Sequence, residues 1–111
     1  MIKALTCEFI GTSFLVAVVV GSGIMGDNLS NGNDGVALLA NTIATGSILF
    51  VLIKAFSEIS GAHFNPIVSL VLFFSNKLSQ KELIFYILCQ VLGGFVGVLI
   101  IHYVFDLEII Q

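Results

Sequence analysis

The heptapeptide Ser60-Gly61-Ala62-His63-Phe64-Asn65-Pro66 interrupts an otherwise apolar chain, and any fold has to accommodate that interruption. Gly61 permits a sharp backbone turn and Asn65 is a good helix N-cap. Pro66 fits the first turn of a helix because its missing N–H has no partner there. A helix is therefore predicted to begin at Asn65 or Pro66. The apolar run that follows is too short to cross a hydrocarbon core of about 30 Å. Residues 57–75 are thus predicted to form a re-entrant loop and a half-helix.

The composition of the chain indicates a membrane protein. Of its 111 residues, 58% are hydrophobic and 10% are charged, and the mean hydropathy is +1.11. Four lysines and no arginine stand against seven acids, so the clustered cations that nucleic-acid binding requires are missing. Cys7 and Cys89 lie in predicted membrane helices far apart in the sequence, which favours two buried thiols over a disulfide. No metal, cofactor or nucleic-acid partner is expected.

Three apolar stretches are long enough to span a bilayer, at about residues 4–25, 36–56 and 82–105. No cleavable signal is evident, so the first of them is expected to direct insertion. The predicted loop 27–35 is dense in turn formers and carries two acids but no cation. The cations fall on the opposite side, at Lys3, Lys54, Lys77 and Lys81. The positive-inside rule then predicts a multi-pass protein of the cell inner membrane, with a cytoplasmic N-terminus and an external C-terminus that carries Asp106 and Glu108.

Asn65 is the first candidate functional residue, because a half-helix that begins inside the membrane leaves backbone N–H groups and a positive dipole end there. Such an end disfavours cations and protons, while the Asn65 amide can donate a hydrogen bond to a passing water or hydroxyl oxygen. Irregular backbone is tolerated at this depth only where it lines a cavity or packs in protein, so Gly61, Ala62 and His63 are predicted to offer carbonyl acceptors to a pore. The alternative is a purely structural cap.

Glu8 and His63 are ionisable side chains in predicted membrane segments. A charge there is costly, so Glu8 is expected to point inward to a partner, unless it lies near enough to the cytoplasmic surface to reach water. His63 has no neighbour in the sequence with which to bind a metal, and packing or hydrogen bonding within the loop is favoured. No nucleophile, base and orienting group converge on one face, so no enzyme is expected.

Small residues recur on two of the predicted spans. Gly93 and Gly97 form a GxxxG pattern on the third span, and Gly46 lies on the second. Such residues let helix backbones approach closely in lipid. A packing role is therefore predicted for all three glycines.

These motifs resemble those of the aquaporin, or major intrinsic protein, family. SGAHFNPIVS at residues 60–69 resembles the family's SGAHxNPAVT, with Ile67 and Ser69 as departures. CEFIGT at residues 7–12 resembles its AEFxGT, and the family's Q-x-x-G-x-x-x-G pattern begins at Gln90. Two further stretches, at 18–26 and 40–46, look like a bacterial branch that is often associated with arsenic resistance.

The resemblance implies a fold and several residue roles. The family joins two inverted repeats of three spans and one half-helix, and its pore forms where the half-helices meet. Residues 1–111 then correspond to one repeat, an all-α half of that fold. The family's glutamate at the position of Glu8 braces a re-entrant loop. Thr45 matches a filter position that is a bulky aromatic in water-selective members, so a small hydroxyl there implies passage of glycerol or arsenous acid. Val68 stands where the second repeat would carry a filter arginine.

Several functions stay open at this point. The leading one is half of a membrane channel for water or small neutral solutes, which needs a second aquaporin half or a homo-oligomer to form a pore. A truncated fragment or interaction subunit without conduction is one alternative. A small proton-coupled exporter that uses Glu8 is another, although exporters of that kind need four full spans.

Overall fold

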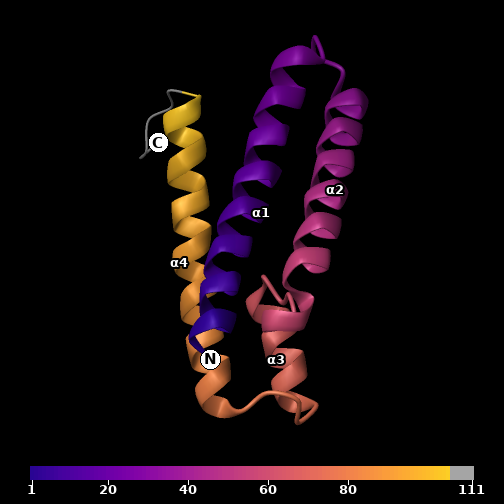
Figure 1. Ribbon diagram of the computed structural model, residues 1–111. Coiled ribbons are helices and arrows are strands. Elements are labelled where there is room, and N and C mark those ends of the chain that lie inside the picture. The colour runs from indigo at the N-terminus through magenta and orange to yellow at the C-terminus, as the bar shows by residue number, and fades with distance from the viewer. Residues whose placement is uncertain (106–111) are drawn as a thin grey trace.

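A computed structural model of the protein describes residues 1–105, and within that range every regular element is a helix (Figure 1). The helices are α1 (Ile2–Leu29), α2 (Asp34–Ser60), α3 (Pro66–Phe74) and α4 (Gln80–Val104). Three of them, α1, α2 and α4, are long and apolar enough to cross a membrane. The all-α membrane fold with three spans and one half-helix is therefore confirmed. Asp106 and Glu108, which entered the prediction of orientation, lie outside the described residues.

Helix α1 is the centre of the arrangement. It packs against both α2 and α4, while α3 packs against α4 below the end of α2 (Figure 1). The contact with α4 is close because Gly93 and Gly97 lie on it. A Cβ atom added at Gly93 would come within 2.6 Å of the Phe9 carbonyl oxygen, and one at Gly97 within 2.5 Å of the Ser13 carbonyl oxygen. Only glycine permits this helix spacing.

Gly46 is placed differently from the other two glycines. An added Cβ atom at Gly46 would meet no atom of residues 1–105 within 4 Å. Its helix, α2, packs mainly against α1 within this part of the chain and leaves much of its apolar surface exposed. Gly46 therefore makes no close helix contact inside the described fold.

The turn between α1 and α2 is shorter than the predicted loop 27–35. Helix α1 continues through Leu29, and α2 begins at Asp34. Asn31 and Gly32 reverse the chain with φ angles of 54° and 83°. The Asn33 side chain accepts a hydrogen bond of 3.1 Å from the Val36 N–H and caps α2. Asp27 and Asn28 have no positive φ angle, and α1 continues through both of them.

The segment between α2 and α3 begins with Gly61, which takes a φ of 85° and ends α2. Because α2 extends to Ser60, the irregular part is limited to residues 61–65. Helix α3 begins at Pro66, and the Asn65 Oδ1 atom caps it by accepting a hydrogen bond of 2.8 Å from the Ile67 N–H. The predicted helix start at Asn65 or Pro66 is confirmed. Helix α4 begins with a capping box between Ser79 and Glu82.

Candidate functional site

Glu8 joins three separate parts of the chain inside the protein. Its side chain is completely buried, and its two carboxyl oxygens accept four hydrogen bonds. Oε2 accepts from the Ser60 hydroxyl at 2.7 Å and from the His63 N–H at 3.2 Å. Oε1 accepts from the Phe64 N–H at 2.9 Å and from Gln90 Nε2 at 2.8 Å. Two of these donors are backbone groups of the loop 61–65, so α1 fixes the path of that loop.

A second set of hydrogen bonds ties the loop to α3 and α4. Gln90 Nε2 donates a further bond of 3.0 Å to the Ser69 hydroxyl, which also lies 2.9 Å from His63 Nδ1. The Tyr86 hydroxyl donates a bond of 2.8 Å to the Ser60 carbonyl. The rings of His63 and Tyr86 are in contact, with centroids 4.8 Å apart. The His63 side chain is thus held in the protein interior.

The backbone between α2 and α3 adopts a conformation that directs its peptide groups. Gly61, Ala62 and Phe64 have positive φ angles of 85°, 54° and 53°. The N–H groups of residues 62–64 all donate to the side chains of Ser60 or Glu8. In a planar trans peptide the N–H group and the C=O group of the preceding residue point in opposite directions. These bonds therefore turn the carbonyl groups of residues 61–63 away from Ser60 and Glu8. The carbonyl oxygens of residues 61–64 accept no hydrogen bond from residues 1–105.

The Phe64 ring anchors this backbone in the protein core. Only 4% of the residue is exposed, and an added Cβ atom at Gly11 would overlap the ring. Phe56 packs edge-on against it, with ring centroids 6.3 Å apart. Phe64 therefore anchors the loop between His63, which is buried, and Asn65, which is exposed.

Asn65 opens into a groove between α1, α4 and the start of α3. The groove has a volume of about 430 Å³ and is lined by residues from these three elements and the loop, namely Thr12, Leu15, Val16, Val19, Val20, Phe64, Asn65, Pro66, Gln90, Val91 and Gly94. Asn65 is exposed, and its Oδ1 atom is used by the cap of α3. Its Nδ2 atom makes no hydrogen bond within the described chain. One amide donor is therefore free at the helix N-terminus.

None of the other residues predicted to line the pore, namely Gly61, Ala62, His63, Thr45 and Val68, lines this groove. Val68, in the first turn of α3, is 40% exposed and does not line the groove. Thr45 lies on α2, half-buried, with an Oγ1 atom that has no partner within residues 1–105. The structure thus brings Glu8, His63 and Asn65 together around the loop and leaves Thr45 apart from them.

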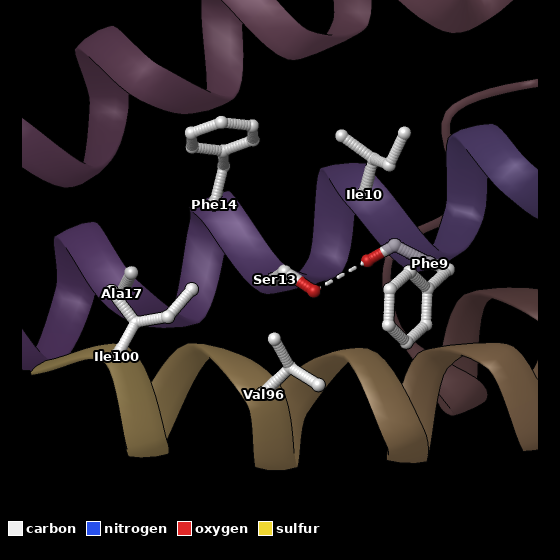
Figure 2. Close-up of a pocket in the computed structure, with 7 residues that line it drawn as sticks. All are labelled: Phe9, Ile10, Ser13, Phe14, Ala17, Val96 and Ile100. Carbon is white, nitrogen blue, oxygen red and sulfur yellow. Dashed lines mark hydrogen bonds between the residues drawn. The ribbon is translucent and has the colours of Figure 1, made fainter.

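A second cleft, of about 200 Å³, lies between α1 and α4 and is apolar (Figure 2). Ser13 is the one hydroxyl residue among those that line it. Its hydroxyl donates a bond of 2.8 Å to the Phe9 carbonyl, as the dashed line in Figure 2 shows. The Ser13 O–H donor is therefore used within the helix. This cleft offers hydrophobic surface alone.

Sequence reasoning assigned no role to Ser60, Ser69 and Tyr86, although each bonds within the Glu8 network. Gln90 was noted only as part of a motif. A signal was present in the spacing, because Tyr86 and Gln90 are polar residues one helical turn apart, and Gly93 and Gly97 continue that face. Polar residues that share a face with the packing glycines of a membrane helix point into the protein.

The chain is similar in sequence to known proteins. A family model described as Major intrinsic protein matches residues 1–109. The chain is 51% identical over 100 residues to the Aquaglyceroporin AqpS of Rhizobium meliloti (strain 1021), an alignment that covers 90% of the chain and 42% of the relative. It is 36% identical over 99 residues to the Aquaporin PIP2-7 of Musa acuminata, which covers 86% of the chain and 35% of the relative. The chain therefore spans less than half the length of these curated relatives.

Proposed function

The chain belongs to the major intrinsic protein family, and on that premise we propose that it supplies one half of a membrane channel for water or small neutral solutes. The observation that carries the proposal is the free Asn65 Nδ2 donor at the N-terminus of α3. Asn65 lines a groove with room for a small solute. The groove and the loop 61–65 then form half of the wall of the permeation path.

The chemistry of the site favours neutral solutes over ions. No residue that lines the groove carries a charged side chain. The helix N-terminus contributes a partial positive charge, which disfavours cations. Beside it, the unpaired carbonyl oxygens of residues 61–64 offer acceptors. A water molecule or a polyol can satisfy both kinds of group, because a hydroxyl both donates and accepts.

Glu8 acts in this proposal as a brace for the loop. All four of its hydrogen bonds come from protein donors, and it has no exposed surface. A carboxyl group that couples proton movement to export needs access to solvent, and Glu8 has none. Residues 1–105 also contain three candidate spans where an exporter needs four. No observation favours the exporter.

A second half is required to enclose the pore. Asn65 lines the groove and is exposed, so residues 1–105 do not close the groove around it. The complement comes from a further segment of the same protein, from a separate chain or from a second copy. We place the N-terminus and the four lysines on the cytoplasmic side of the cell inner membrane, following the positive-inside rule.

The proposed solute class includes glycerol. Thr45 is smaller than the aromatic residue that the family resemblance associates with water selectivity. The printed name of the rhizobial relative, an aquaglyceroporin, points the same way. A polyol is wider than a water molecule, and a threonine at this position leaves more room for it than an aromatic ring would.

Liposome permeability tests the proposal. We would reconstitute the chain with the C-terminal half of the rhizobial relative and measure water and glycerol flux, with each half alone and empty liposomes as controls. The proposal predicts flux above the empty liposomes for the combined halves that exceeds the sum of the two halves alone. Folded and inserted halves that together give no more flux than empty liposomes would contradict it.

A further inference from the structure

The side of α2 that points away from the rest of the protein carries a regular stripe of exposed residues. Asn41 and Leu52 mark the inner side, since the Asn41 amide bonds to the Val19 carbonyl and Leu52 is buried. Ile43 and Lys54 each lie two positions further on and therefore on the opposite side, because each residue turns a helix by about 100°. The stripe recurs at alternating intervals of four and three residues and consists of Val36, Ala40, Ile43, Ser47, Phe50, Lys54 and Ser57, all of them exposed. This spacing is typical of a helix that packs along another helix.

Lys54 is an exposed charge well inside the membrane-spanning part of the chain. It lies six residues before Ser60, the last residue of α2. Ser60 and Gln90 bond to the same Glu8 side chain, so the end of α2 is level with a residue that lies ten positions into α4. Helix α3 continues below the end of α2 (Figure 1). A charge at such a depth is costly and usually pairs with an opposite charge.

The carboxyl group of Glu58 lies on the same side of α2 as Lys54, one helical turn further along, and is also exposed. The two residues are poorly placed to pair within one chain. Lys54 Nζ lies 5.9 Å from the centroid of the Phe50 ring, one turn in the other direction. A lysine that precedes a glutamate by four residues is also the weaker of the two orders for an ion pair within a helix. Both charges can therefore pair with another chain.

We propose that the stripe is a contact surface for α2 of a second copy of the chain, with Lys54 of each copy beside Glu58 of the partner subunit. Copies that obey the same charge bias insert in the same orientation, so their α2 helices run parallel and a twofold axis relates the stripe to itself. The contact then gathers two lysines and two glutamates with no net charge. Ala40 and Ser47 are small enough to let the two helices approach closely.

The proposed contact surface is separate from the groove at Asn65, because no residue of α2 lines that groove. It goes beyond the proposed function, since it requires neither a second half nor conduction. Lipid chains could cover the apolar residues of the stripe, but hydrocarbon offers no partner to Lys54 or Glu58. A second copy supplies both partners from the same two positions.

Cysteine cross-linking tests whether two α2 helices meet. In a chain with Cys7→Ala and Cys89→Ala, we would add Ser47→Cys in the stripe and oxidise the full chain in liposomes. Leu38→Cys is the matched control, because Leu38 is 66% exposed on the same helix but lies two positions from the stripe residues on either side of it. A disulfide needs Cα atoms within about 7 Å, so the dimer yield of Ser47→Cys should exceed that of Leu38→Cys by at least about fivefold. Equal yields would overturn the proposal and leave the surface to lipid.

Charge exchange tests the pairing of Lys54 with Glu58. Added to Ser47→Cys, Lys54→Glu makes both charges of the surface acidic and Glu58→Lys makes both basic. Each variant alone should lose at least about fivefold of the dimer yield, because like charges then face each other. A mixture of the two variants, distinguished by epitope tags, should form mixed dimers at the parent yield or above. A chain that carries both exchanges should dimerise like the parent.

Two results of these experiments would overturn the proposal. Mixed dimers that are no more abundant than the dimers of either variant alone would show that the two charges do not meet across the contact. Ser47→Cys dimers that disappear when a second channel half is added would assign the surface to that half. Dimers that persist in its presence would support a contact between two copies of this chain.

Discussion

The backbone N–H of Phe64 donates a hydrogen bond of 2.9 Å to Oε1 of Glu8, which lies 56 residues earlier in the chain. The bond connects the first turns of α1 with the loop that precedes the half-helix α3. Because the neighbouring His63 N–H bonds to the other carboxyl oxygen, a single side chain orients two consecutive peptide groups. The position of Asn65 in the groove depends on this one buried carboxyl group.

Replacement of Glu8 by glutamine should therefore destabilise the protein strongly. In Glu8→Gln one of two acceptor oxygens becomes an NH2 donor that faces other donors, and we expect a loss of about 2–4 kcal/mol in the free energy of unfolding. Denaturant titration in detergent micelles measures it. Glu82→Gln is the matched control, because glutamine also completes a capping box, and its cost should stay below about 0.5 kcal/mol. Equal losses of unfolding free energy in the two variants would contradict the role of Glu8 as a brace for the loop.

The glycines on α4 and α2 should respond differently to the same substitution. Gly97→Ala forces a Cβ atom against the Ser13 carbonyl and should separate α1 from α4, at a cost of about 1–3 kcal/mol. Gly46→Ala adds a methyl group to open space and should stabilise α2 by about 0.5–1 kcal/mol through helix propensity. Unfolding titrations compare the two variants. A destabilising Gly46→Ala would indicate that this glycine packs against a partner helix.

Thr45 should control the size of the solute. Thr45→Phe should reduce glycerol flux by at least about tenfold while water flux falls less, because a ring narrows the path without removing its hydrogen-bonding groups. The comparison uses liposomes in which both channel halves are present. Thr42→Phe serves as a control on the same helix, since Thr42 is exposed and bonds only to the Leu38 carbonyl. Glycerol flux that is unchanged in Thr45→Phe would exclude Thr45 from the filter.

Single cysteines should report both the orientation and the re-entrant path. In a chain with Cys7→Ala and Cys89→Ala, we expect Glu58→Cys and Lys77→Cys to react with an impermeant thiol reagent from the cytoplasmic side, and Asn31→Cys from the outside. The half-helix α3 has nine residues and cannot cross the membrane, so residues on either side of it return to the same face. Labelling of Glu58→Cys and Lys77→Cys from opposite sides would contradict the re-entrant path.

The helices and the start of α3 could be predicted because their causes are local. Long apolar runs specify spans, and the dipeptide Asn65-Pro66 specifies a capped helix start whatever surrounds it. The ends of α1 and α2 were less predictable. Asp27 and Asn28 suit a loop or an exposed last turn equally well, and α1 continues through them to Leu29, whereas the cap at Asn33 marks the start of α2.

The hydrogen-bond network of Glu8 could be predicted only in part. Its inward direction follows from the cost of a charge in a membrane, but the identity of its partners depends on contacts between residues 52 to 82 positions apart. The atoms Thr12 Oγ1 and Gln90 Oε1, which have no hydrogen-bond partner within residues 1–105, could not be predicted from the sequence. Whether an atom lacks a partner depends on the positions of all its neighbours. Such features require the packed structure.

The most direct test of the central claim compares two asparagines whose side chains cap helices. Asn65 caps α3 inside the groove, whereas Asn33 caps α2 in an exposed turn. Asn65→Asp keeps the cap, replaces the free amide donor with an acceptor and adds a negative charge; Asn33→Asp makes the same change away from the site. In liposomes that contain both channel halves, we predict that Asn65→Asp abolishes water and glycerol flux and that Asn33→Asp leaves both within about twofold of the parent. Flux through correctly inserted Asn65→Asp equal to that of Asn33→Asp would contradict the claim that solutes pass Asn65.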